Sequence, residues 1–340
     1  MKEGEKNNHI FKIVFSLTFM LIIIYYFLGK NPDSVIRDLQ LVNYKFVILS
    51  FIFGAWAYIN RGLRWIVLID ALGYKSSKLN SIAAVSVGYF TNLFIPRAGE
   101  ISRCTALNQV EKVPVDKLFG TILIERVIDF IILIFIMLIS ILLNSSEIIR
   151  AFNKYQQIPK EDPSNTKFII LGVFLFIGLL IYLSRNKVKK NRFYNKVKQF
   201  IIGLKEGFKS IKKVKNKSSF WFHTLSIWAM YFLMTYICFH CIQETSGLGI
   251  VDGLFLLSLG GIGMSIPTPG GIGSYHLMVM IGLVALQIPN GFISIEKYNE
   301  YNPAMLFPII IWFAQSFVAI IMGSVGLLIL FMNKKQEINA

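Results

Sequence analysis

Charged side chains of this chain gather inside apolar stretches, where arginines and carboxylates can pair with each other or bind an anion. They lie in NRGLRW (60–65), PRAGEISR (96–103) and ERVID (125–129), and they are Arg61, Arg64, Arg97, Glu100, Arg103, Glu125, Arg126 and Asp129. Several are three residues apart, as Arg126 and Asp129 are, so that such a pair shares one face of a helix. Five arginines against three carboxylates leave a positive excess, and a guanidinium group binds phosphate through two parallel hydrogen bonds. The set predicts a site for an anionic headgroup, such as a lipid phosphate, with Glu100 held by Arg97, Arg103 or Arg126.

An alternative assigns the same charges to structure. An ionised side chain at bilayer depth costs about 2.5–3.5 kcal/mol on insertion scales, so it needs a partner or water. In this alternative Arg61, Arg64 and Arg103 extend to the cytoplasmic surface, and residues 125–129 form a structural ion network. Because the charges surround an expected helix break, we favour the functional interpretation.

The elements that carry these motifs belong to a membrane protein. Of the 340 residues 54% are hydrophobic, and the mean hydropathy is +0.58, which excludes a soluble enzyme and predicts an all-α polytopic integral membrane protein. About six full spans are expected, near 11–29, 46–70, 118–143, 167–184, 219–242 and 304–332. The first lacks a cleavage site and is expected to be retained.

Two further apolar segments, 81–108 and 250–288, are broken in the middle. The breaks are PRAG, with Pro96, and PTPGG, with Pro267, Pro269, Gly270 and Gly271. Proline removes a helix hydrogen bond, and most arms are shorter than the roughly 20 residues of a span, so we expect re-entrant helical hairpins. Two full crossings per segment would leave every loop on the same side and stay an alternative.

The order span, span, broken segment, span occurs twice, with opposite orientations in the membrane, and each broken segment contains Ser-x-Gly before its break. This predicts an inverted repeat whose two breaks meet near the midplane and form a substrate site, which is a transporter plan.

The expected organisation has four parts. They are a first membrane repeat over 1–143, an external loop and span over 144–184, a basic segment over 185–217, and the rest of the second repeat over 218–340. The basic segment has thirteen Lys or Arg and one acid, so the positive-inside rule places it, with both termini, in the cytoplasm and the protein in the cell membrane. Its apolar positions recur at helical spacing, so it is either an amphipathic helix on an anionic leaflet or an ordinary linker. Neither interpretation implies nucleic-acid binding.

The second broken segment is glycine-rich and uncharged apart from His276. Its glycines either expose backbone amides to a cavity or pack helices closely. A protease interpretation of GMS (263–265) and a metal site at CFHC (238–241) are both disfavoured, so neither a metal nor a cofactor is expected.

Four motifs together resemble the lysylphosphatidylglycerol synthase transmembrane-domain family, or flippase-like family, which includes the lipid-flippase half of the multiple peptide resistance factor. They are RGLRW (61–65), NLFIPRAGEISR (92–103, starting at Asn92), ERVID (125–129) and PTPGGIG (267–273). The resemblance implies a protein without its own chemistry that moves or presents a polar lipid, with the charged residues lining the path. His276 stands where the family often has glutamate, which implies a different headgroup or a proton-sensitive site. We expect no aminoacyl-transferase domain, so a lysyltransferase label would be inherited by name only.

Two other functions remain as alternatives. One is a transferase that acts on a lipid carrier, which would need a catalytic constellation that the short external loops do not supply. The other is a membrane scaffold that binds lipid or a partner enzyme of envelope synthesis. Neutralising the buried charges discriminates the scaffold from a transporter, because only the transporter should then lose function.

Overall fold

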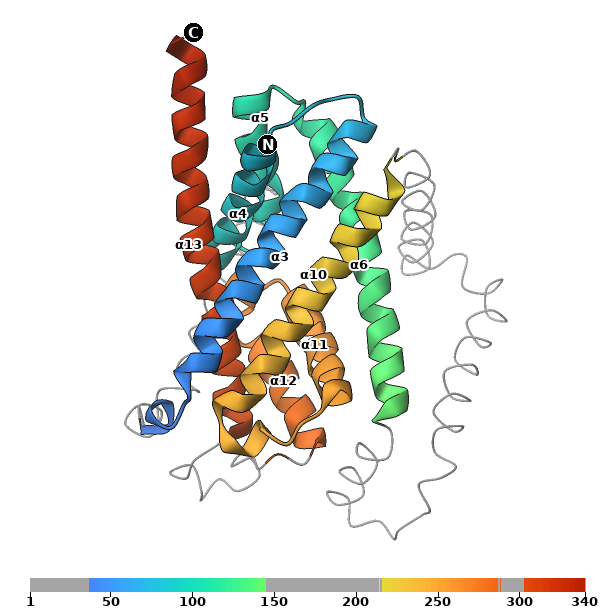
Figure 1. Ribbon diagram of the computed structural model, residues 1–340, viewed down its shortest axis with the longest axis vertical. Helices are drawn as coiled ribbons and strands as arrows, with labels where there is room; N and C mark the ends of the chain where they lie inside the picture. The colour runs from blue at the N-terminus through green and yellow to red at the C-terminus, as the bar shows by residue number, and fades with distance from the viewer. Residues whose placement is uncertain (1–36, 145–213, 215, 287, 289–302, 340) are drawn as a thin grey trace, which may run out of the picture.

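The computed structural model describes residues 37–144, 214, 216–286, 288 and 303–339. Every regular element in these ranges is a helix, and no strand occurs among them. The long helices are α3 (Tyr44–Ala71), α6 (Val115–Leu143), α10 (Lys217–Ile237) and α13 (Pro303–Asn339), and they run along the long axis of the molecule (Figure 1).

Four helical segments are long and apolar enough to cross a membrane: Tyr44–Ala71, Val115–Leu143, Lys217–Cys241 and Pro303–Lys334. They coincide with four of the six predicted spans. The other two, 11–29 and 167–184, lie outside the described residues, as do the basic segment up to residue 213 and the loop at 289–302. The total of six spans therefore stays a prediction.

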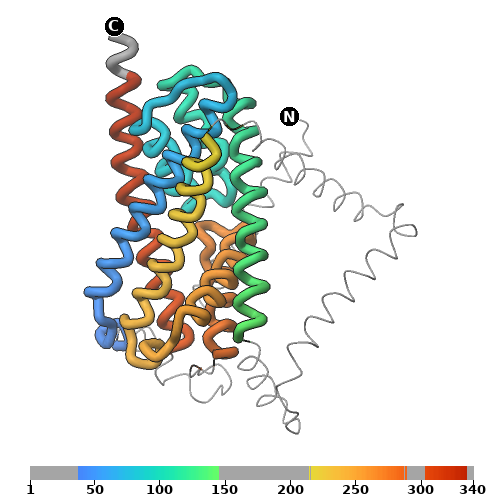
Figure 2. The backbone as a smooth tube through the Cα atoms, turned by 45° about the vertical axis from the view of Figure 1, so that its right-hand side comes forward, coloured from blue at the N-terminus to red at the C-terminus, as the bar shows by residue number. Residues whose placement is uncertain are grey.

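Four shorter helices form two packed pairs. The first pair is α4 (Lys78–Phe94) and α5 (Gly99–Glu111), and the second is α11 (Ile250–Ser265) and α12 (Ser274–Ala285). They have 17, 13, 16 and 12 residues, fewer than the roughly 20 of a full span. The helix breaks predicted in both segments are confirmed, at 95–98 and at 266–273. One pair occupies the upper half of the molecule and the other the lower half, in both views (Figures 1 and 2).

Glycine brings α4 and α5 together at their break. A Cβ atom on Gly88 would lie 2.8 Å from the carbonyl oxygen of Gly99, so the two backbones approach more closely than a side chain allows. The Gly99 amide, one of the free amides that begin α5, donates to the Asn92 side-chain oxygen at 2.7 Å. Arg97 has a φ of 61°, which turns the chain between the two helices.

The second break is a glycine turn that α13 holds in place. Gly270, Gly271 and Gly273 have φ values of 55°, 74° and 82°, a region that favours glycine. The indole N–H of Trp312 in α13 donates to the Gly270 carbonyl at 2.7 Å. Just before the break, a Cβ on Gly263 would lie 2.7 Å from the Cα atom of Tyr275, so α11 and α12 also touch through backbone.

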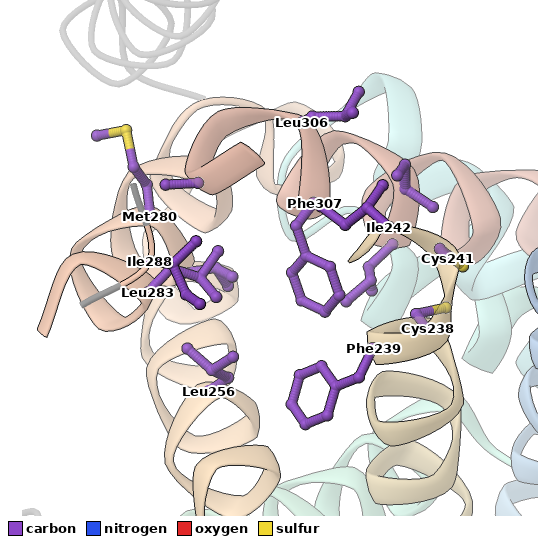
Figure 3. Close-up of a cluster of buried hydrophobic side chains, with 14 of the residues drawn as sticks. Cys238, Phe239, Cys241, Ile242, Leu256, Met280, Leu283, Ile288, Leu306 and Phe307 are labelled. Atoms are coloured by element: carbon purple, nitrogen blue, oxygen red, sulfur yellow. The ribbon is translucent and has the colours of Figure 1, made fainter. Parts of the chain in front are cut away.

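A hydrophobic cluster joins the second pair to its neighbours (Figure 3). The rings of Phe239 and Phe307 are 5.5 Å apart, and Leu256 and Leu283 are almost fully buried beside them. Phe239 belongs to η2 (Cys238–Cys241), a 3-10 turn that follows the last α-helical residue of α10 and precedes a second short turn, η3 (Gln243–Thr245). Three residues of the CFHC motif, Cys238, Phe239 and Cys241, are therefore packed core, whereas His240 is exposed. No group of three or more possible metal ligands occurs among the described residues.

Candidate functional site

A buried ion network ties α3 to α6. The guanidinium group of Arg64 donates to both carboxylate oxygens of Asp129, at 2.7 and 2.9 Å, and to Glu125 at 3.3 Å. Arg61, one turn earlier, donates to Asp129 at 3.2 Å and to the hydroxyl of Tyr231 on α10 at 2.7 Å. The side chain of Arg64 is 0% exposed and that of Glu125 is 2% exposed. Arg61 and Arg64 were predicted to share one face of α3, and they do, because both donate to the carboxylate of Asp129.

The network extends to the first helix pair through Arg103 of α5. Arg103 pairs with the second carboxylate oxygen of Glu125 and lies 4.3 Å above the ring of Trp65. Trp65 in turn donates to the Thr121 hydroxyl at 2.7 Å. Three arginines and two carboxylates thus form one buried unit that fixes α3, α5 and α6 together. A buried charge that lost its partner here would be strongly destabilising.

The proposed extension of Arg61, Arg64 and Arg103 to the cytoplasmic surface is wrong. Their relative exposures are 6%, 0% and 3%, and each points into the protein onto a carboxylate. The structural ion network that the same alternative placed at 125–129 is present for Glu125 and Asp129. The ion pairs of Glu125 and Asp129 with these arginines hold α3, α5 and α6 together.

A second ion pair, between Arg126 of α6 and Glu100 of α5, lies at the surface of the described fold. Its N–O distance is 3.1 Å, and the side chains are 44% and 22% exposed. Arg126 was expected to share a face with Asp129, three residues on, but Asp129 points into the buried network while Arg126 points outward. Three arginines were expected as partners of Glu100, and in the structure Arg126 forms the ion pair with it.

Arg97 joins the two helix pairs at their breaks. Its side chain is exposed and donates to the carbonyl oxygen of Ser265, at the end of α11, at 3.1 Å. Next to this contact, a Cβ on Gly270 would lie 3.3 Å from the Leu93 side chain. The two breaks therefore meet, as predicted for a site built from broken helices. No carboxylate forms an ion pair with Arg97 within the described ranges.

The remaining predicted residues lie in the breaks or beside them, with Asn92 near the end of α4 and His276 in the first turn of α12. Asn92 closes the first break, Pro96 is half-buried in it, and Pro267 is exposed in the second, whereas Pro269 is buried at the start of the turn η4 (Pro269–Gly271). His276 is buried in α12, accepts a hydrogen bond from the Gly273 amide at 3.3 Å and lies 5.5 Å from the Trp312 ring. These contacts place His276 beside the second break and α13, in the other half of the molecule from the ion pairs.

Aromatic partners of the network were not predicted. Arg61 lies between the rings of Tyr89 and Tyr231, at 5.5 and 5.3 Å from their centroids, and Tyr89 stacks on Tyr58 at 4.6 Å. Tyr231 is 170 residues from Arg61 in the chain. A tyrosine within an apolar span has no local spacing that could reveal this contact.

The helix breaks and the charged motifs all lie within one family match. A sequence profile described as the lysylphosphatidylglycerol synthase TM region matches residues 10–293. The chain belongs to this family. The family resemblance inferred from the motifs is thus confirmed, and with the apolar helices it makes the protein a multi-pass membrane protein.

One relative of this chain is the UPF0104 membrane protein MJ1595 of Methanocaldococcus jannaschii. It is 26% identical over 310 residues, which cover 82% of this chain and 84% of the relative. No solved structure matches the chain. The similarity thus extends over most of both sequences and supports a membrane protein related to lipid handling.

Proposed function

We propose that this protein binds a lipid by its phosphate-bearing headgroup and moves it between the leaflets of the cell membrane. The observation that carries the proposal is the outward-facing Arg126–Glu100 pair, which lies beside the first helix break. Among the described residues Arg126 pairs with one carboxylate only, at 3.1 Å, and its side chain is 44% exposed. An arginine of this kind can offer its guanidinium fork to a phosphate.

The depth of Arg126 in its helix supports a path within the membrane. It stands 11 residues after Val115 and 17 before Leu143, which is about 17 and 26 Å along a helix that rises about 1.5 Å per residue. A hydrocarbon core is about 30 Å thick, so an upright α6 would hold Arg126 inside it. A half-exposed charge at that depth needs water or a polar headgroup beside it.

The finer architecture belongs to the same proposal. Six spans and two re-entrant hairpins would form an inverted repeat, with both termini and the basic segment 185–217 in the cytoplasm. The meeting of the two breaks at Arg97 and Ser265 supports this plan, because transporter sites form where discontinuous helices meet. In this proposal the binding partners are anionic membrane lipids, and the chain transports without performing catalysis.

Lipid movement in proteoliposomes tests the proposal. Vesicles with purified protein and fluorescent phosphatidylglycerol are treated with a membrane-impermeant quencher, and the fraction of label that becomes accessible is followed over time. Arg126→Gln should slow the movement about 10- to 100-fold, because hydrogen bonds to charged groups contribute about 1.5–3 kcal/mol. Lys117→Gln is the matched control, since Lys117 is an exposed cation on the same helix, and it should move lipid at the original rate.

Two results would contradict the proposal. Equal rates for Arg126→Gln and the unaltered protein would remove Arg126 from the path. If protein-containing vesicles moved no labelled lipid faster than empty ones, the chain would be better described as a membrane scaffold for a partner enzyme of lipid or envelope synthesis.

A further inference from the structure

The buried ion network carries more positive than negative charge. It contains two carboxylates, those of Glu125 and Asp129, and three arginines, which are Arg61, Arg64 and Arg103. Each of the five residues has a relative exposure of at most 9%, so solvent does little to offset the surplus. Hydrogen bonding shows the same deficit, because the Nε atom of Arg103 is buried and has no acceptor among the described residues. A buried charge without a full set of partners is costly, so the network favours an anion close by.

This surplus lies next to the outward-facing pair of Arg126 and Glu100. Arg126 directly follows Glu125 in α6. Glu100 stands one helical turn before Arg103 in α5. Arg61 is within electrostatic range of Arg126 and repels it. The pair itself is neutral and partly exposed, so an anion bound to Arg126 would also be attracted by the buried network behind it.

Arg97 adds a further positive charge, three residues before Glu100. No carboxylate forms an ion pair with its exposed guanidinium group in the part of the chain that the structure describes. Three residues span at most about 10 Å of chain, so Arg97 stays close to the pair. α5 begins between Arg97 and Glu100, at Gly99, and a helix N-terminus adds a partial positive charge. Together the network, the pair and Arg97 hold five arginines and three carboxylates, which leaves two positive charges uncompensated.

We infer that the lipid bound here ends in a phosphomonoester, whose phosphate group carries two negative charges. The inference rests on the proposed function and names its class of substrate. A phosphodiester such as phosphatidylglycerol carries one negative charge, so the loaded site would keep one uncompensated positive charge, which is costly in a membrane. A phosphomonoester loses its second proton with a pKa of about 6, so near neutral pH it balances the whole surplus. Its three terminal oxygens also give the guanidinium groups more acceptors than a diester does.

Competition between two lipids that differ by one methyl group tests the inference. Proteoliposomes that move fluorescent phosphatidylglycerol receive increasing mole fractions of unlabelled phosphatidate or phosphatidylmethanol at about pH 8, where phosphatidate carries two charges. Methylation turns the monoester into a diester and removes one charge. Phosphatidate should halve the rate of label movement at a mole fraction at least about tenfold lower than phosphatidylmethanol does, because one more charge interacts with the surplus at close range.

A third competitor identifies the tail that carries the phosphate. Geranylgeranyl phosphate has the same terminal phosphomonoester on a polyprenyl chain. If it inhibits at least as strongly as phosphatidate, the substrate is a polyprenyl lipid. If its inhibition lies between those of phosphatidate and phosphatidylmethanol, the substrate is a glycerolipid. Inhibition weaker than that by phosphatidylmethanol would contradict recognition through a phosphomonoester.

Two substitutions change the charge of the site in opposite directions. Arg97→Gln removes a positive charge and should lower the ratio between the two competing mole fractions by about threefold or more, whereas Glu100→Gln removes a negative charge and should raise it. The same vesicles serve every variant, so the effect of the competitors on surface charge cancels. Lys117→Gln removes an exposed cation from the first turn of α6 and should leave the ratio unchanged. Loss of packing alone would not move the ratio in opposite directions.

The outcomes separate the headgroup from transport itself. If labelled phosphatidylglycerol moves but both competitors inhibit at equal mole fractions, the phosphomonoester is wrong and lipid transport stands. The same conclusion follows if Arg97→Gln and Glu100→Gln do not shift the ratio in opposite directions. If no labelled lipid moves faster than in empty vesicles, transport and headgroup are both overturned.

Discussion

Arg97 combines an unfavourable backbone conformation with an exposed guanidinium group. Its φ of 61° lies in the left-handed region, which costs a residue with a side chain roughly 1–2 kcal/mol. Replacement by glycine removes this backbone cost. It also removes the hydrogen bond from the Arg97 side chain to the Ser265 carbonyl. We predict that Arg97→Gly raises the free energy of unfolding by up to about 1 kcal/mol and slows lipid movement. Thermal unfolding in detergent and the proteoliposome assay measure the two effects.

Arg97→Lys serves as the comparison, because lysine keeps the charge and the backbone cost but loses the planar fork. It should leave stability unchanged and slow lipid movement less than Arg97→Gly does. Normal lipid movement in Arg97→Gly would mean that the guanidinium group takes no part in the path.

The sequence identifies the charged residues but not their division into buried and outward-facing groups. Arg64 and Arg126 both lie in apolar helices, yet the side chain of one is 0% exposed and that of the other is 44% exposed. The difference depends on how α3, α5 and α6 are rotated against each other. The partner of Arg64 is 65 residues away, so local spacing could not reveal it.

Close helix contact at the first break depends on the absence of a side chain at Gly99. A Cβ there would overlap the Gly88 carbonyl and lie 2.6 Å from the Asn92 side-chain carbon. Gly99→Ala should therefore destabilise the protein by about 1–3 kcal/mol, as overpacking does. The matched control is Gly120→Ala in α6, where nothing lies within 4 Å of the new Cβ, and it should stabilise by roughly 0.5–1 kcal/mol. Equal melting temperatures for the two variants would contradict this account of the break.

The position of each break was predictable because proline and glycine act locally. α4 ends at Phe94 and α5 begins at Gly99, around the predicted PRAG. The stabilisation of the breaks was not predictable, since it involves residues far along the chain. Trp312 caps the Gly270 carbonyl across 42 positions, and Arg97 reaches Ser265 across 168.

At the scale of the whole molecule, hydropathy predicts the long helices well because their apolar runs exceed what a soluble core needs. Hydropathy does not predict how the two helix pairs are arranged relative to each other, because that arrangement depends on tertiary packing. α6 contacts α5 in one half and α11 in the other, and Leu133 fills the space beside Gly261. One helix thereby packs against a member of each pair.

The inverted repeat makes a prediction about sides. In the structure, residues 112–114, between α5 and α6, and the first turn of α6, which contains Lys117, lie at the upper end of Figure 1, and residues 243–249, before α11, lie at the lower end. Lys117 and Ser246 are both exposed, and Cys104, Cys238 and Cys241 are buried, so single introduced cysteines should dominate labelling. A membrane-impermeant maleimide should modify Ser246→Cys in intact cells, and Lys117→Cys only after the membrane is permeabilised. Labelling of both positions from one side would show that the two pairs do not enter from opposite faces and would remove the inverted repeat. Opposite labelling with the sides exchanged would keep the repeat and reverse the orientation, because the positive-inside rule would then have failed for Lys112 and Lys117.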